Sequence, residues 1–370
     1  MLYLGFRINS RSMTGSWPYA KRAELYKELT AILSQQSHGV TISPQQMASI
    51  IGKLQSAISI SPWGTYLSFS MATNLTRASR NAYSTSRSWW SKAKIRVNKT
   101  VIQDIRLLLE TLLAPEEDPI WTRPIALLVP REATHCFKSD ASYAGIGGWT
   151  LNFGGLMWRI TREDLVLLGF NMKTIGQAID EPTDPATPGL HINPLEFIAC
   201  IINLWVLLKC IQLLPPCDTG YVIDLLSDNT SALSWLKVTA ATRNPALQPL
   251  ARFASALLIQ ASHVLTRVQP RHIAGKLNVE ADALSRFTNG RFKSWADVIA
   301  QCSQLQTCTI CLLPPELLVT LAALSSSTPI EVTYQEQTPA PLILDLDFLP
   351  DGSNLRVIRS SLPLSYDPLK

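Results

Sequence analysis

The segment CFKSDASYAGIGGWT, residues 136–150, decides the fold class of this 370-residue chain. Its glycines, together with those at 154 and 155, mark the ends of short strands at the spacing of β-hairpins. GLMWRI (155–160) is the third of these predicted strands. Strand-like segments then alternate with helical ones up to about residue 287. The sequence therefore predicts an α/β domain over roughly residues 131–290.

Four acids in this region stand where strands end or helices begin, in CFKSD, HINPLE, YVIDLLSD and HIAGKLNVEAD: Asp140, Glu196, Asp228 and Asp282. Each has an ordinary explanation, which is a turn for Asp140 and a helix N-terminus for the other three. The same elements can also converge on one face of an α/β sheet. Spacing alone leaves both interpretations open. Asp224 competes for the third position, but Asp228 directly precedes a helix start.

The flanking regions have different character. Residues 1–130 predict a mostly helical region after an opening strand, LYLGFRI (2–8), with a helix capped by Ser43. Residues 291–370 predict two short helices, SWADVIAQCSQL and PELLVTLAAL, and then a flexible tail rich in Pro and Ser.

No acid occurs between Glu28 and Asp104, a stretch that carries eight basic residues interleaved with aromatic ones. Basic groups bind phosphates and exposed aromatic rings stack on bases, so this segment predicts a nucleic-acid surface. A solvated basic face is the alternative. The candidate contacts are Lys53, Arg77, Arg80, Arg87, Lys92, Lys94 and Arg96.

Composition favours a globular intracellular protein. Hydrophobic residues make up 46% and charged residues 16%. The longest apolar stretch, 197–208, is shorter than a membrane span needs, and the N-terminus has no signal-peptide pattern. Seven irregularly spaced cysteines suit reduced thiols, and the single C-x-x-C at Cys308 and Cys311 favours apolar packing over zinc. We expect a cytoplasmic or nuclear location without membrane association.

The four acidic segments resemble the RNase H domain of reverse transcriptases. The closing segment HIAGKLNVEADALSR is the most specific, and SDNTSALSWL with ADALSR is most similar to DIRS-type, tyrosine-recombinase retroelements. The resemblance extends upstream to the end of a polymerase palm and a thumb or connection region, but no Y-x-D-D-like motif is present. It implies an RNase H-like mixed five-stranded sheet with flanking helices, in a retroelement product whose polymerase active site is missing. Residues from about 160 to 190 would be an insertion.

The resemblance also implies a function. Asp140, Glu196, Asp228 and Asp282 would bind two Mg²⁺ ions, or Mn²⁺, and cleave the RNA strand of RNA–DNA hybrids by two-metal-ion hydrolysis. His272 would assist proton transfer or product release. The remaining candidate nucleic-acid contacts are Asn229 and Asn278. The missing polymerase portion or other retroelement proteins are possible partners. The alternative is a catalytically inactive nucleic-acid-binding remnant.

Overall fold

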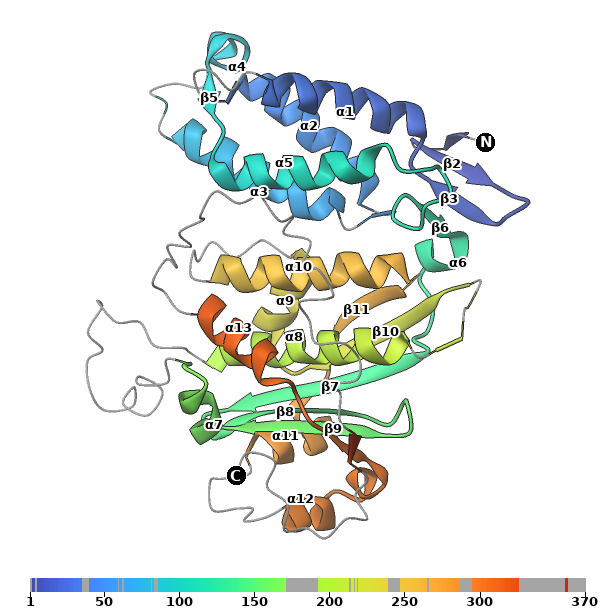
Figure 1. Cartoon of the computed structure of the whole chain (residues 1–370), viewed down its shortest axis with the longest axis vertical. Coiled ribbons are helices and arrows are strands. Elements are labelled where there is room, and N and C mark those ends of the chain that lie inside the picture. The colour runs from blue at the N-terminus through green and yellow to red at the C-terminus, as the bar shows by residue number, and fades with distance from the viewer. Residues whose placement is uncertain are drawn as a thin grey trace. The chain divides into compact units, whose positions relative to one another are not determined.

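The computed structural model describes residues 2–3, 5–34, 40–58, 60–61, 63–80, 82, 86–170, 192–212, 214–215, 217, 219–238, 247–264, 266–286, 295–325 and 357–358. The chain divides into two compact units (Figure 1). Unit 1 comprises residues 1–131 with 216–220 and 258–267, and unit 2 comprises the remainder.

Unit 1 contains a small antiparallel sheet at its N-terminal end, in the order β1-β2-β3-β6. Its strands are β1 (Leu2–Tyr3), β2 (Phe6–Asn9), β3 (Thr14–Ser16) and β6 (Thr122–Pro124). The expectation of one continuous opening strand was wrong. Gly5 adopts φ 92°, a conformation that glycine tolerates, and the chain turns back there so that Leu2 pairs with Arg7.

Helices make up most of unit 1, as expected. They are α1 (Tyr19–Leu33), α2 (Pro44–Ala57), α3 (Trp63–Arg80), α4 (Arg87–Lys92), α5 (Lys99–Leu112) and α6 (Ile125–Leu128). The same unit contains a separate two-stranded antiparallel sheet of β4 (Thr41–Ile42) and β5 (Ile95–Arg96). The Ser43 side chain accepts a hydrogen bond from the Gln46 amide at the start of α2, which confirms the predicted N-cap.

Unit 2 is built on a mixed sheet in the order β11-β10-β7-β8-β9-β12-β13. Its longer strands are β7 (His135–Ser142), β8 (Gly145–Thr150), β9 (Leu156–Thr161), β10 (Tyr221–Ser227) and β11 (Thr266–His272). Strands β7, β8 and β9 form an antiparallel meander, and β10 pairs with β7 in parallel. The parallel pair places the C-terminal ends of β7 and β10 at the same edge of the sheet.

Helices cover both faces of this sheet. Successive residues of a strand face opposite sides of the sheet, so Gly147 and Gly148 of β8 lie against different helices. A Cβ on Gly147 would meet Leu284 of α11 (Val279–Ser285), and one on Gly148 would meet Asn203 of α8 (Ile192–Ile211). The central strands are thus enclosed between α8 and α11. Unit 2 also contains α7 (Arg162–Leu167), α9 (Thr230–Val238) and most of α10 (Gln248–His263).

Helix α8 is the one described helix that is long and apolar enough to cross a membrane. In the fold, 94% of its apolar window is buried, and the helix packs on β7 and β8 and against α9. The burial is that of a core helix, as expected for this segment.

The C-terminal region contributes more to the sheet than expected. The two predicted helices are present as α12 (Trp295–Gln301) and α13 (Pro315–Ser325). Between them, β12 (Thr309–Cys311) pairs in parallel with β9, and the two-residue β13 (Val357–Ile358) pairs with β12. The expected five-stranded sheet is therefore extended at one edge. The rest of the predicted tail, and residues 171–191 of the predicted insertion, lie outside the described residues.

Candidate metal centre

Asp140 lies within a strand and not in a turn. Strand β7 continues to Ser142, and Asp140 pairs in register with Gly147 of β8. Its side chain is only 4% exposed. Since Gly147 has no side chain, α11 approaches β8 closely at this point, and the hydroxyl of Ser285 on α11 donates a hydrogen bond of 2.6 Å to Oδ2 of Asp140. The turn explanation for Asp140 is therefore excluded.

Glu196 projects from α8 toward the sheet. Its carboxylate accepts hydrogen bonds from the backbone amide of Ala141 on β7 and from the hydroxyl of Ser227 at the end of β10, the latter at 3.4 Å. The side chain is 3% exposed. Because these partners belong to β7 and β10, Glu196 does not act as a helix cap. It connects α8 to the edge where the parallel strands end.

Asp228 follows the last residue of β10, but its neighbour caps the next helix. The Asn229 side chain accepts a hydrogen bond of 3.0 Å from the Ala232 amide at the start of α9. Capping by Asn229 leaves the Asp228 carboxylate available for another role. Gly275 lies so close that a Cβ there would come within 2.9 Å of Oδ2 of Asp228.

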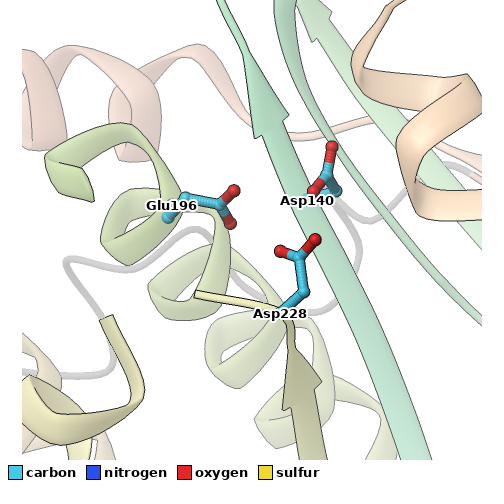
Figure 2. A group of neighbouring side chains, drawn as sticks. All are labelled: Asp140, Glu196 and Asp228. Carbon is cyan, nitrogen blue, oxygen red and sulfur yellow. The ribbon is translucent and has the colours of Figure 1, made fainter. Parts of the chain in front are cut away.

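The three carboxylates meet at one point. Asp140, Glu196 and Asp228 each offer an oxygen, and these oxygens lie within 4.8 Å of one another. Figure 2 shows the three side chains directed toward a common space from β7, α8 and the end of β10. Two of them are buried and Asp228 is partly exposed. Carboxylate oxygens at this spacing are the donors that hard divalent cations such as Mg²⁺ prefer.

The electrostatics of the cluster favour a cation. Burial, and then the charges of Asp228 and Asp282, raise the pKa of Asp140 to about 7, although the Ser285 hydrogen bond lowers it. Burial and the charge of Asp140 raise the pKa of Glu196 to about 9. The raised pKa values of Asp140 and Glu196 mean that the fold brings carboxylates together in a buried place without providing enough positive charge to neutralise them. Protons or bound cations must compensate it at neutral pH.

Asp282, the fourth predicted acid, lies beside this group but outside it. It is in the first turn of α11, and its Oδ1 accepts a hydrogen bond of 2.5 Å from Nε of Arg286. Its side chain is 33% exposed, and its charge is among those that raise the pKa of Asp140. The structure thus gathers three of the four predicted carboxylates at one centre, with Asp282 paired to an arginine nearby.

The other residues predicted for the site have distinct positions. Asn278 was expected to contact nucleic acid, but it is 1% exposed and its amide donates to the backbone oxygen of Ser139 on β7 at 3.0 Å. It fastens α11 to β7, and a direct contact with a ligand is excluded by its burial. Asn229 has a structural role as the cap of α9 and donates to Asn193 at 2.8 Å. His272, at the end of β11, is exposed.

Asp224, the competitor for the third position, is engaged elsewhere. Its Oδ2 accepts a hydrogen bond of 2.9 Å from Arg271, and it lies within β10 opposite Cys136 of β7. It is not part of the carboxylate group. The preference for Asp228 is supported by this geometry.

The basic residues of unit 1 fall into two classes. Lys53 does not have the free charge that was expected, because it pairs with Glu24 and Glu28 of α1, each at 2.8 Å. Those acids precede the acid-free segment, but α2 packs its lysine back against α1. The other candidates are exposed and form no ion pair within the described part of the chain: Arg77, Arg80, Arg87, Lys92, Lys94 and Arg96.

Ser285, like Ser227, is a residue of the site that was missed from the sequence. It binds Asp140 through its hydroxyl, and its backbone oxygen accepts a hydrogen bond of 2.7 Å from Ser142. A signal was present, because Ser285 belongs to the same ADALSR motif as Asp282. A serine three residues after an acid on a helix lies on the same face, and α11 turns that face toward β7.

Comparisons with known proteins leave the family open. No protein-family model matches the chain. No curated protein matches it significantly. The resemblance to reverse-transcriptase nuclease domains therefore remains a prediction.

Proposed function

We propose that unit 2 is an RNase H-type endoribonuclease that hydrolyses the RNA strand of RNA–DNA hybrids with divalent cations. The main support for this function is the spacing of the three carboxylates. Three carboxylates from β7, α8 and the end of β10 bring their oxygens within 4.8 Å of one another. Sequence motifs singled out the same three residues.

The arrangement of the sheet supports the same function. An antiparallel meander β7-β8-β9 is followed by β10, which pairs in parallel with the first strand, and β11 lies beyond β10. A mixed sheet that carries the first acid on its first strand is what the RNase H-like interpretation expects. Strand β12 pairs with β9 and β13 pairs with β12, so both extend the opposite edge of the sheet, away from the β7–β10 pair.

The donor set fits Mg²⁺ or Mn²⁺. Asp140, Glu196 and Asp228 would hold the ions, and two of these groups have pKa values raised by burial, so a cation would replace protons that they otherwise retain. Bound divalent ions supply a nucleophile from water at neutral pH and stabilise charge on the departing 3′ oxygen.

The protein's own groups position this chemistry. Ser285 holds one oxygen of Asp140 through a 2.6 Å hydrogen bond, and the Ala141 amide and Ser227 hydroxyl orient Glu196. These contacts fix carboxylates that would otherwise repel one another. Asp282 lies on α11 beside Asp140 and is free to exchange Arg286 for another cation, since both side chains are partly exposed. We place it as the fourth acid on that basis.

His272 is the candidate for moving protons. It ends β11, and the next amide, that of Ile273, donates to the backbone oxygen of Ser227, one residue before Asp228. The chain at His272 is therefore fixed close to the third carboxylate while its ring is exposed to solvent. An imidazole in this position suits proton transfer or product release.

The substrate class follows from the same interpretation. RNA strands differ from DNA at the 2′-hydroxyl, which lies in the shallow minor groove of A-form duplexes and allows an enzyme to choose the RNA strand of a hybrid. Motifs that resemble DIRS-type reverse transcriptases further suggest a retroelement product. Other retroelement proteins are the natural candidates for partners.

Incubation of the full chain with a hybrid labelled on either strand tests the function. We expect Mg²⁺-dependent or Mn²⁺-dependent cleavage of the RNA strand, no cleavage of the DNA strand, and loss of activity in Asp140→Asn with hybrid binding retained. Glu280→Gln is the matched control, since Glu280 is on α11 but outside the carboxylate group. Hybrid binding without cleavage under either ion would favour the alternative, an inactive nucleic-acid-binding remnant.

A further inference from the structure

One end of unit 1 contains a cavity that the proposed nuclease does not use. It is an open cavity with a volume of about 370 Å³, and its lining residues come mainly from the end of α3, from α4 and from β5. Three exposed basic side chains, Arg77, Lys94 and Arg96, contribute to its lining, together with Asn74 and Trp89. No acid lines this cavity.

The positive charge at this cavity is not neutralised by the protein. Arg77, Lys94 and Arg96 form no ion pair with any residue that the structure describes. Arg77 is in the last turn of α3, and Lys94 and Arg96 flank the buried Ile95 of β5. These three cations, one from α3 and two from the β5 segment, surround one cavity and can contact an anion such as a phosphate together.

Trp89 gives the cavity an aromatic wall. It is partly buried, because one part of the side chain packs against the core of unit 1. The ring also meets Trp90 edge to face, with the centroids 5.3 Å apart and an interplanar angle of 86°. Two contacts hold the ring in place, so a base that stacks on it does not have to immobilise it first.

We propose that this cavity binds one nucleotide of a single-stranded nucleic acid, with the base against Trp89 and the adjoining phosphate among Arg77, Lys94 and Arg96. An unpaired base can unstack from its neighbours and enter such a cavity, whereas the bases inside a duplex are held by stacking and pairing. An inorganic anion would use the cations but not the indole. The site is independent of the carboxylate cluster and does not depend on nuclease activity.

The test measures binding of a labelled single-stranded oligouridine to the full chain in EDTA, which excludes cleavage. Trp89→Leu should weaken binding by about fivefold or more. Trp90→Leu removes an indole that does not line the cavity and should weaken binding less, through the loss of one contact that holds the Trp89 ring. The effect of Trp89→Leu should disappear with an oligonucleotide of abasic sugar-phosphates. Equal losses on the two ligands would overturn the stacking role.

A charge series provides a second measurement that does not depend on the tryptophan. Replacing Arg77, Lys94 and Arg96 by Ala should reduce the slope of log K against log salt by about 0.7, the value for one phosphate contact with a single strand. The matched triple variant of Arg80, Arg87 and Lys92, which are exposed but outside the cavity, should change it less. Equal reductions in both triples would mean a diffuse basic surface and no nucleotide site.

Two further outcomes would also overturn the inference. A blunt duplex whose binding is weakened by Trp89→Leu as much as that of a single strand of equal length would show that unpaired bases are not recognised. Displacement of the oligouridine by polyglutamate of equal charge, at equal concentration, would show an anion surface that serves acidic peptides equally well. Circular dichroism of each variant checks that the helices of unit 1 persist.

Discussion

Replacing Asp140 by Asn removes one charge from the carboxylate cluster and keeps the size of the side chain. The remaining oxygen can still accept the hydrogen bond from Ser285. The neighbouring acids then lose a repulsive partner, since the charge of Asp140 is one of the causes that raise the pKa of Glu196. We therefore expect this variant to be more stable than the natural protein when no metal is bound.

The magnitude follows from the pKa of Asp140, which burial raises from 3.8 to about 7. That difference corresponds to about 4 kcal/mol of unfavourable free energy for holding the ionised carboxylate in the fold. Local relaxation reduces the cost, so we expect a gain of roughly 2–4 kcal/mol in the free energy of unfolding above pH 7.

The pH dependence has a defined sign. A carboxyl whose folded pKa exceeds its unfolded pKa binds more protons in the folded state, so its contribution to stability decreases as pH rises from about 4 to about 7 and is constant above that. The natural protein should lose stability over this window. The variant lacks this term, and its advantage should grow from pH 5 to pH 8.

Urea unfolding of the metal-free full chain at several pH values measures this difference, with Glu280→Gln as the control. Saturating Mg²⁺ should restore the stability of the natural protein at pH 8 and have a smaller effect on Asp140→Asn, because binding to the folded state stabilises it by mass action. A variant that is less stable than the natural protein at pH 8, or an advantage that does not change with pH, would refute the electrostatic reasoning.

Three further substitutions or truncations test the packing around the site. Gly147→Ala should destabilise unit 2 by at least ~2 kcal/mol in urea unfolding, because the new Cβ would lie 2.5 Å from a side-chain atom of α11. Gly52→Ala in α2 is the control. Its Cβ would meet no atom within 4 Å, so this variant should be neutral or slightly stabilising. Gly275→Ala should displace the Asp228 carboxylate. Its effect on the free energy of Mg²⁺ binding, measured by calorimetry, should exceed its effect on the free energy of unfolding. An unchanged Mg²⁺ affinity would contradict the contact between residue 275 and Asp228. Deletion of residues 330–370 should leave cleavage and the thermal midpoint of unit 2 nearly unchanged, because β13 adds only two residues at the sheet edge, and a loss of folding would show that the tail is part of the core.

The sequence predicted elements of both units well where their signals are local. Glycine spacing marked the β7–β8–β9 meander, and the N-terminal patterns before α2 placed the cap at Ser43. Strand β12 was missed since three residues between two helices carry too little pattern to distinguish a strand from a loop. Its position is set by pairing with β9 and not by its own sequence.

The site was predicted in its residues but not in their division of roles. Asp228 and Asn229 are adjacent polar residues before a helix, and only the fold shows that Asn229 is the cap while the carboxylate of Asp228 is free. Asn278 was misassigned for a similar reason, because its burial depends on how α11 lies against β7. Lys53 was counted as a free charge because its partners are on another helix, outside the acid-free segment.

The central claim is that Asp140, Glu196 and Asp228 together hold divalent cations. Anomalous diffraction from crystals of the full chain grown or soaked with Mn²⁺ tests it most directly. We expect anomalous density between the three carboxylates, and its loss in Asp140→Asn crystals treated in the same way. Absence of density there at saturating Mn²⁺, with the three side chains ordered, would contradict the claim.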